Sequence, residues 1–316
     1  MVTVKRPLSY SEQIERLKFF HKIQIEDDNQ AKEILQKINY YRLSGYGIGL
    51  TSSSNSDEYR EGISLQHLFR LYKFDSVLKN SLMHVIEQIE IQLRTQIAYA
   101  LAIKYGSLGY LNVANFKDNV YKDHSKLIYS FSGEVGRNKS KPFVKHHIEE
   151  YEEQFPIWVA VELFTFGSIS TLYSIMKVED QKTVSNFFKC SPKYLSNWIK
   201  VLVEIRNICA HYCRLYNLPL KHAPMLYKEN NQYISKNGQQ NKLFPVFLVI
   251  KRILKANADW KIFYQFFKNV MNDYKDVVNL PFNGFPCNWV QILDKDLSSF
   301  VEKNSKSKVY NIESQT

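Results

Sequence analysis

The stretch that decides the fold is "SLQHLFRLYKFDSVLKNSLMHVIEQIEIQLRTQIAYALAIK", residues 64–104. It contains neither glycine nor proline, and its apolar residues return at steps of three or four, the period of one helix face. The recurring residues are Leu78, Leu82, Val85, Ile89, Leu93, Ile97 and Leu101. The pattern predicts one long helix, or two nearly collinear helices, with a continuous buried face.

Helical signals continue on the N-terminal side of this stretch. Ser9 and Glu12 form a capping-box pattern ahead of "EQIERLKFFHK". Asp27 and Asp28 then precede "AKEILQKINYYRL", a second helical segment that stops at Gly45. We therefore expect two short helices before the long one.

On the C-terminal side of this stretch, a turn-rich region precedes further helical segments. A turn-rich region is predicted from Gly106 through "SFSGEVGRNKSKP", followed by helices at about 141–153, 157–177 and 192–216, with a bend near Gly167. The sequence contains no internal repeat and no alternation typical of a sheet. It therefore predicts an all-α helical bundle, with N-terminal helices and a helical C-terminal extension.

The polar loop "YKENNQYISKNGQQNK", residues 227–242, suggests how the chain is divided. We interpret residues 1–228 as one helical domain and residues 229–316 as a helical extension. The extension carries the helical segments "FPVFLVIKRILKA" and "WKIFYQFFKNVMNDYK" and ends in the charged stretch "EKNSKSKVYNIESQT", which is predicted to be frayed.

Composition narrows the class of protein. A hydrophobic content of 45% with 21 Tyr and 20 Phe is typical of a folded chain. No apolar run is long enough for a membrane span or a signal peptide, so a cytoplasmic protein without a membrane partner is expected. Four cysteines are too few for a disulfide framework. The net charge of +11 makes nucleic acid the first partner to consider, although it also serves solubility.

The stretch "EIRNICAHYCRLYN", residues 204–217, places three polar residues in a predominantly apolar helix. Asn207 and His211 are four residues apart and share a face, whereas Arg206 is displaced by about 140° from His211 but is long enough to reach round. Most of the other positions are apolar and predict a buried helix. The trio is therefore expected at the edge of the core or at an interface.

Two interpretations of the trio remain open. In a structural role, Arg206 pairs with a carboxylate such as Glu90 or Glu162, and His211 caps or bridges. In a functional role, the Arg206 guanidinium holds a phosphate and the His211 imidazole moves protons near neutral pH. The second combination suits cleavage of RNA, in which the 2′-hydroxyl attacks the phosphorus and no metal is required.

The motif "RNICAH" is similar to the R-x-x-x-x-H signature of HEPN domains in its Arg-Asn form. More specifically, "SYSEQIERLK", "INYYRLSGYG", "PIWVAVELFTFGSISTLY" and "IRNICAHYCRLYN", in this order, resemble the Abi-like abortive-infection family of the AbiD/AbiF type. The resemblance extends over residues 5–225. It implies a HEPN-like helical bundle, a toxin-like role in phage defence and an endoribonuclease activity without a cofactor.

The resemblance also implies site residues and partners. It assigns catalytic roles to Arg206 and His211 and a supporting role to Asn207. One motif per chain implies a homodimer, and some similar proteins act with a small non-coding RNA that restrains them. The chain departs from its relatives at Tyr212 and Tyr216, where a second His and a Trp are common. The Arg206–His211 pair is intact, but the departure puts a second catalytic imidazole within the chain in doubt.

The remaining candidates concern RNA contacts and metals. Arg42, in "NYYRLSGY", and Tyr212 and Arg214 are the predicted RNA contacts. Cys209, His211 and Cys213 are a poor zinc site because His211 points away from the face that the two cysteines share, so no metal is expected. An RNA-binding regulator that does not cleave, and a dimeric scaffold, remain the alternatives to a nuclease.

Overall fold

The structure is a computed structural model that describes residues 6–53, 56–234 and 239–295. Over these residues the chain forms helices joined by loops, with isolated β-bridges and no β-strand. The prediction of an all-α fold is therefore confirmed. The predicted frayed stretch at residues 302–316 lies outside the described residues.

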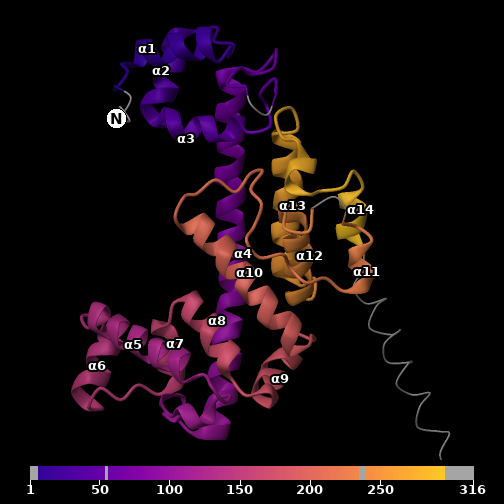
Figure 1. The fold of residues 1–316 in the computed structure, drawn as a ribbon. Coiled ribbons are helices and arrows are strands. Elements are labelled where there is room, and N and C mark those ends of the chain that lie inside the picture. Colours follow the sequence, from indigo (N-terminus) through magenta and orange to yellow (C-terminus); the bar gives the residue numbers. More distant parts are fainter. Residues whose placement is uncertain (1–5, 54–55, 235–238, 296–316) are drawn as a thin grey trace, which may run out of the picture.

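The predicted long helix is a single continuous helix, α4 (Leu65–Tyr105). The Ser64 side chain caps its start by accepting a hydrogen bond from the backbone N–H of His67, and Gly106, at φ 76°, ends it. Its 41 residues span about 60 Å at 1.5 Å per residue. All seven residues of the predicted apolar stripe are buried. In Figure 1 this helix runs through the molecule, and the other helices lie along it.

The N-terminal helices lie at one end of α4 (Figure 1). They are α1 (Tyr10–Glu15), which continues into the short π-helix η1 (Arg16–Phe20), then α2 (Asp28–Lys37) and α3 (Tyr40–Ser44). The capping box of Ser9 and Glu12 forms as predicted. The second predicted helix is instead two helices, because Ile38 is extended and the Asn39 side chain accepts the N–H of Tyr41 to begin α3.

Five helices gather at the other end of α4 (Figure 1): α5 (Tyr121–Asn138), α6 (Pro142–Glu150), α7 (Ile157–Leu163), α8 (Phe166–Ile175) and α9 (Val178–Phe187). The prediction of a turn-rich region up to residue 142 is wrong over α5, which tolerates two glycines because Leu127 and Phe131 anchor its buried face. The helix predicted at 157–177 breaks at Phe164, and Thr165 caps the start of α8.

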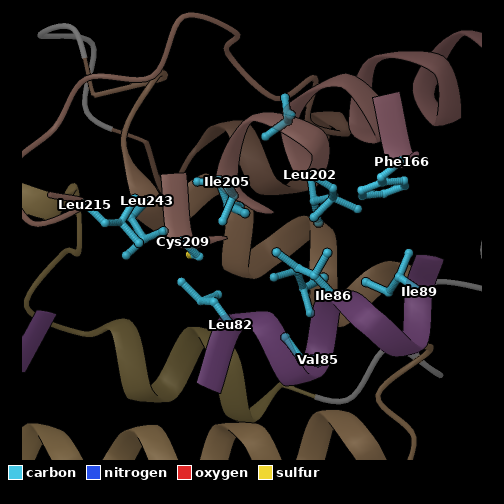
Figure 2. Close-up of a cluster of buried hydrophobic side chains, with 14 of the residues drawn as sticks. Leu82, Val85, Ile86, Ile89, Phe166, Leu202, Ile205, Cys209, Leu215 and Leu243 are labelled. Carbon is cyan, nitrogen blue, oxygen red and sulfur yellow. The ribbon is translucent and has the colours of Figure 1, made fainter. Parts of the chain in front are cut away.

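Helix α10 (Pro192–Ala210), which carries the polar trio, packs across the middle of α4. Figure 2 shows Leu202, Ile205 and Cys209 of α10 facing apolar side chains of α4, among them Leu82 and Ile86. This contact fixes α10 to the central helix through a fully apolar layer.

The C-terminal helices are α11 (Lys228–Asn231), α12 (Leu243–Ile253), α13 (Ala258–Asp273) and α14 (Trp289–Asp294). Of these, α12 and α13 lie along one side of α4, and α11 and α14 lie beyond them (Figure 1). Their buried residues belong to the same core cluster as those of α4 and α10, and Figure 2 shows Leu243 beside Leu215. The boundary predicted near residue 229 stays a prediction. Among the described residues, no helix is both long and apolar enough to cross a bilayer.

Candidate functional site

The end of α10 is built by a specific turn of the backbone. Tyr212 adopts the left-handed conformation, at φ 55°, directly after His211. The N–H of Cys213 donates to the carbonyl of Ile208 at 3.0 Å, and the N–H of Tyr212 donates to that of Cys209 at 3.1 Å. These two bonds form the Schellman motif that closes many helices, with tyrosine in the position that glycine usually takes. His211 is therefore the C-cap residue, directly after the last helical residue Ala210, at a sharp change of chain direction.

The polar trio lies at the surface of this helix end. Arg206 is half-buried, whereas Asn207 and His211 are exposed, and the Arg206 guanidinium donates to Asn207 Oδ1 at 3.3 Å. In the described part of the chain, the imidazole of His211 makes no hydrogen bond. The expectation of a trio at the edge of the core fits this arrangement, but the imidazole itself is open to solvent.

The ion pairs expected for a purely structural Arg206 do not form. Glu90 pairs instead with Arg94 on the same helix, one turn away, and Arg94 also donates to the carbonyl of Val161. Glu162 is exposed, and Arg206 has no carboxylate partner within the described residues. The guanidinium is thus available to an external anion.

A hollow of about 450 Å³ adjoins Arg206 on the surface of α4. His84 and Glu87 line it together with Arg206, and both are exposed. His84 is a titratable group beside the motif that sequence reasoning missed, because a single histidine on a long helix carries no distinguishing pattern. It is a candidate contact for a substrate that reaches Arg206.

The segment after His211 is held by a buried ion pair on α4. Asp75 is fully buried and lies 3.0 Å from Lys79 Nζ. The Asp75 carboxylate also accepts the N–H groups of Leu215 and Tyr216, the latter at 2.7 Å. Lys79 in turn donates to the carbonyl of Cys213 at 2.9 Å. The chain that leaves α10 is therefore fixed to the central helix by charge-assisted hydrogen bonds.

The N-terminal helices complete this anchor. Tyr46 is buried and its hydroxyl donates to Asp75 Oδ2 at 2.7 Å. Burial, reinforced by the negative charge of Asp75, raises the pKa of Tyr46 far above its usual value, so the phenol stays a donor. Arg42 of α3 donates to the carbonyl of Tyr212 at 2.5 Å. Residues far apart in the sequence thus meet at the end of α10.

The three predicted RNA contacts take different positions. Arg42 and Tyr212 are exposed and adjacent, and 74% of the Tyr212 surface is accessible. Arg214 is half-buried against Gly45 and donates to the carbonyl of Tyr216. Burial lowers the pKa of the Arg214 guanidinium, while the nearby Asp75 partly offsets that effect. Arg42 and Tyr212 therefore form an exposed surface beside His211. Arg214 adds a positive charge from a half-buried position against Gly45.

The cysteines near the motif differ in their surroundings. Cys209 is buried, and this burial raises the pKa of its thiol to about 12, whereas Cys213 is exposed. Across the described residues, no three potential ligands gather as a metal site. Tyr216, the second departure from the motif, is buried and accepts the N–H of Asn279, so it joins the site to the C-terminal helices.

Comparison with known protein families gives a match over more than half of the chain. The family model described as "Abi-like protein" matches residues 33–217, from within α2 to the loop that follows α10. The matched segment contains α4, the buried ion pair and the polar trio. No curated protein and no solved structure matches the chain.

Replacing Asp75 by Asn should lower the free energy of unfolding by about 3–5 kcal/mol, because the change leaves the Lys79 ammonium buried without its counter-charge. Chemical denaturation measures this loss. Asp118→Asn is the matched control, since Asp118 is exposed, and we expect it to change stability by at most about 0.5 kcal/mol. Equal stability of both variants would show that the buried pair does not anchor the loop.

Tyr212→Gly should stabilise the fold by about 0.5–1 kcal/mol, because glycine adopts the left-handed conformation without strain. The same change should weaken RNA binding by removing an exposed ring. Glu153→Gly is the control, since Glu153 also has a positive φ, 59°, and is also exposed, but is distant from the motif in the sequence. It should gain stability and keep RNA affinity, as measured by denaturation and fluorescence anisotropy. Unchanged affinity of Tyr212→Gly would remove Tyr212 from the RNA surface.

Proposed function

The chain belongs to the Abi-like protein family, and from this premise we propose that it is a HEPN-type, metal-independent endoribonuclease. Family membership indicates a role in abortive infection. The finer proposal is a toxin-like effector that cleaves RNA in the cytoplasm of the infected cell. Its proposed partners are RNA as the substrate, a small non-coding RNA as the regulator, and a second copy of the chain.

One observation carries this proposal: Arg206, which has no carboxylate partner among the residues that the structure describes, and the exposed His211 share the anchored end of α10. A guanidinium that no carboxylate neutralises is a ready ligand for a phosphate, to which it can donate two parallel hydrogen bonds. The net charge of +11 raises the local concentration of such polyanions. The structural role has less support, because among the described residues neither Glu90 nor Glu162 pairs with Arg206.

The proposed reaction is an intramolecular transesterification of RNA. A base removes the proton of the 2′-hydroxyl, the 2′-oxygen bonds to the adjacent phosphorus, and the bond to the 5′-oxygen breaks. An acid protonates the leaving 5′-oxygen, which gives a 2′,3′-cyclic phosphate and a 5′-hydroxyl. In this scheme Arg206 holds the phosphate, His211 transfers a proton, and Asn207 orients the Arg206 guanidinium through its Oδ1.

A dimer would supply the second proton-transfer group. With His211 from two subunits, one imidazole could act as base and the other as acid. An exposed apolar face on α4 supports this arrangement: Ile91, which borders the hollow at Arg206, and Ile103, which is 73% exposed, lie on it with Tyr99 between them. Trp158 of α7 is also exposed, at 55%. Apolar side chains exposed along one face of a helix, as on α4, are typical of an association surface.

His211→Ala should lower the rate of RNA cleavage by about 10²–10⁴ and abolish toxicity in cells, since general acid-base groups contribute that much. Stability should not change, because the side chain is exposed. Arg206→Lys should also be severely impaired, because an ammonium lacks the bidentate fork, whereas Arg137→Lys on the remote α5 should cleave normally. The measurement is cleavage of RNA in EDTA. A soluble His211→Ala protein that stays fully toxic would favour the RNA-binding regulator that does not cleave.

Ile103→Glu should convert the dimer to monomers and lower cleavage, because a charge replaces an apolar contact at the proposed interface. Ile262→Glu is the matched control, since Ile262 of α13 is 65% exposed and lies outside this face. Light scattering coupled to size-exclusion chromatography measures the mass. A wild-type monomer that cleaves RNA at its full rate would contradict the two-subunit site.

A further inference from the structure

A large cleft lies in the N-terminal part of the chain, and none of its described lining residues belongs to the Arg206–His211 motif. It is lined by residues of α1, η1, α3 and the segments 47–53 and 56–60, and its volume is about 1890 Å³. Sites for a single small molecule occupy roughly 300–1,000 Å³. The cleft is therefore large enough for an extended or polymeric ligand.

The charges that line this cleft are predominantly positive. Arg6, Arg16 and Arg60 contribute to the lining, and Asp57 is the one acidic residue among the described lining residues. Arg6 is paired with Glu12 at 2.9 Å. Arg16 lies over the ring of Phe20 at 4.5 Å and, within the described chain, has no carboxylate partner. The balance favours an anionic ligand.

Aromatic and hydroxyl groups accompany these arginines. Tyr41 lines the cleft and is 85% exposed, and Tyr10 lines it at 39% exposure. Tyr40 is held in the wall, because its hydroxyl is hydrogen-bonded to His21 Nε2 at 2.7 Å. Accessible rings interleaved with arginines are the combination that binds single-stranded nucleic acid, whose bases stack and whose phosphates pair with guanidinium groups.

The cleft adjoins the motif through α3. Tyr41 faces the cleft, and the next residue, Arg42, reaches the carbonyl of Tyr212 directly after His211. Ile48 also lines the cleft, and its carbonyl accepts a hydrogen bond from Asn217 in the loop that follows α10. A nucleic-acid strand that is bound in the cleft could therefore continue past Arg42 toward His211.

We propose that the cleft binds single-stranded RNA upstream or downstream of the scissile phosphate, with Arg16 on the backbone and Tyr41 stacked on a base. This assignment rests on the proposed function, since it places an extension of the same substrate. An acidic protein could also suit the charges, but it would not require the exposed ring of Tyr41. The prediction that follows is a dependence of RNA affinity on strand length.

The test uses the full chain with His211→Ala, so that binding is measured without cleavage. Fluorescence anisotropy with labelled single-stranded RNAs of about 4 and about 16 nucleotides spans the site sizes of single-strand binders. The longer RNA should bind more tightly. Arg16→Gln with Tyr41→Ala should weaken binding of the longer RNA by about tenfold or more and thereby remove that advantage. Tyr41→Ala alone should show part of the loss, and its exposed position preserves the fold.

The matched control is Arg137→Gln with Tyr129→Ala on α5. It removes the same charge and the same ring, and Tyr129 is 84% exposed. This control should keep the length dependence. Equal loss in the control, or none in either cleft variant, would overturn the proposal, and in the second case an acidic protein would be the better occupant. If the cleft variants lose affinity while wild type cleaves nothing, the proposed activity fails and the RNA-binding cleft stands.

Discussion

The structure depends on one buried ion pair, Asp75 with Lys79, in the N-terminal half of the central helix. Charges buried in this way are tolerated only when partners satisfy them, because the desolvation of two ions costs several kcal/mol. Here the partners come from two other parts of the chain: the hydroxyl of Tyr46, and the loop after α10 through the N–H groups of Leu215 and Tyr216 and the carbonyl of Cys213. The pair therefore ties the N-terminal helices, α4 and the loop after α10 into one unit.

This anchor explains how the motif can be both exposed and precisely held. Helix α10 is fixed by its apolar face against α4, and the residues that follow His211 are fixed by the ion pair (Figure 2). Arg206 and His211 extend from this rigid end with their polar atoms uncommitted to carboxylates. Rigid support beneath free functional groups is the arrangement that positions a substrate accurately.

The sequence predicted the parts of this fold that follow from local pattern. The period of the apolar residues predicted α4, and Ser9 with Glu12 predicted the start of α1. Helix α5 was missed because Gly133 and Gly136 suggested turns, whereas tertiary packing of Leu127 and Phe131 overrides that preference. The break between α2 and α3 depends on a single capping side chain, Asn39, within an otherwise helical pattern.

The sequence also predicted only part of the candidate site. The spacing of Arg206, Asn207 and His211 was visible, but the exposure of His211 depends on the left-handed turn at Tyr212, which the sequence does not signal. The ion pair was overlooked because charged residues on a helix usually face solvent. Its signal was present, since Asp75 and Lys79 lie on the same face as Leu71 and Leu82 and are one turn apart.

In the proposed reaction, the anchored end of α10 cleaves RNA through the 2′-hydroxyl of the substrate. The most direct measurement is the chemistry of the RNA ends formed by the purified protein in EDTA, with a matched RNA that carries a single 2′-deoxynucleotide at the cleavage position. We expect 2′,3′-cyclic phosphate and 5′-hydroxyl ends, and no cleavage at the deoxynucleotide. Products with 5′-phosphate ends, or equal cleavage of the deoxy-substituted RNA, would contradict it.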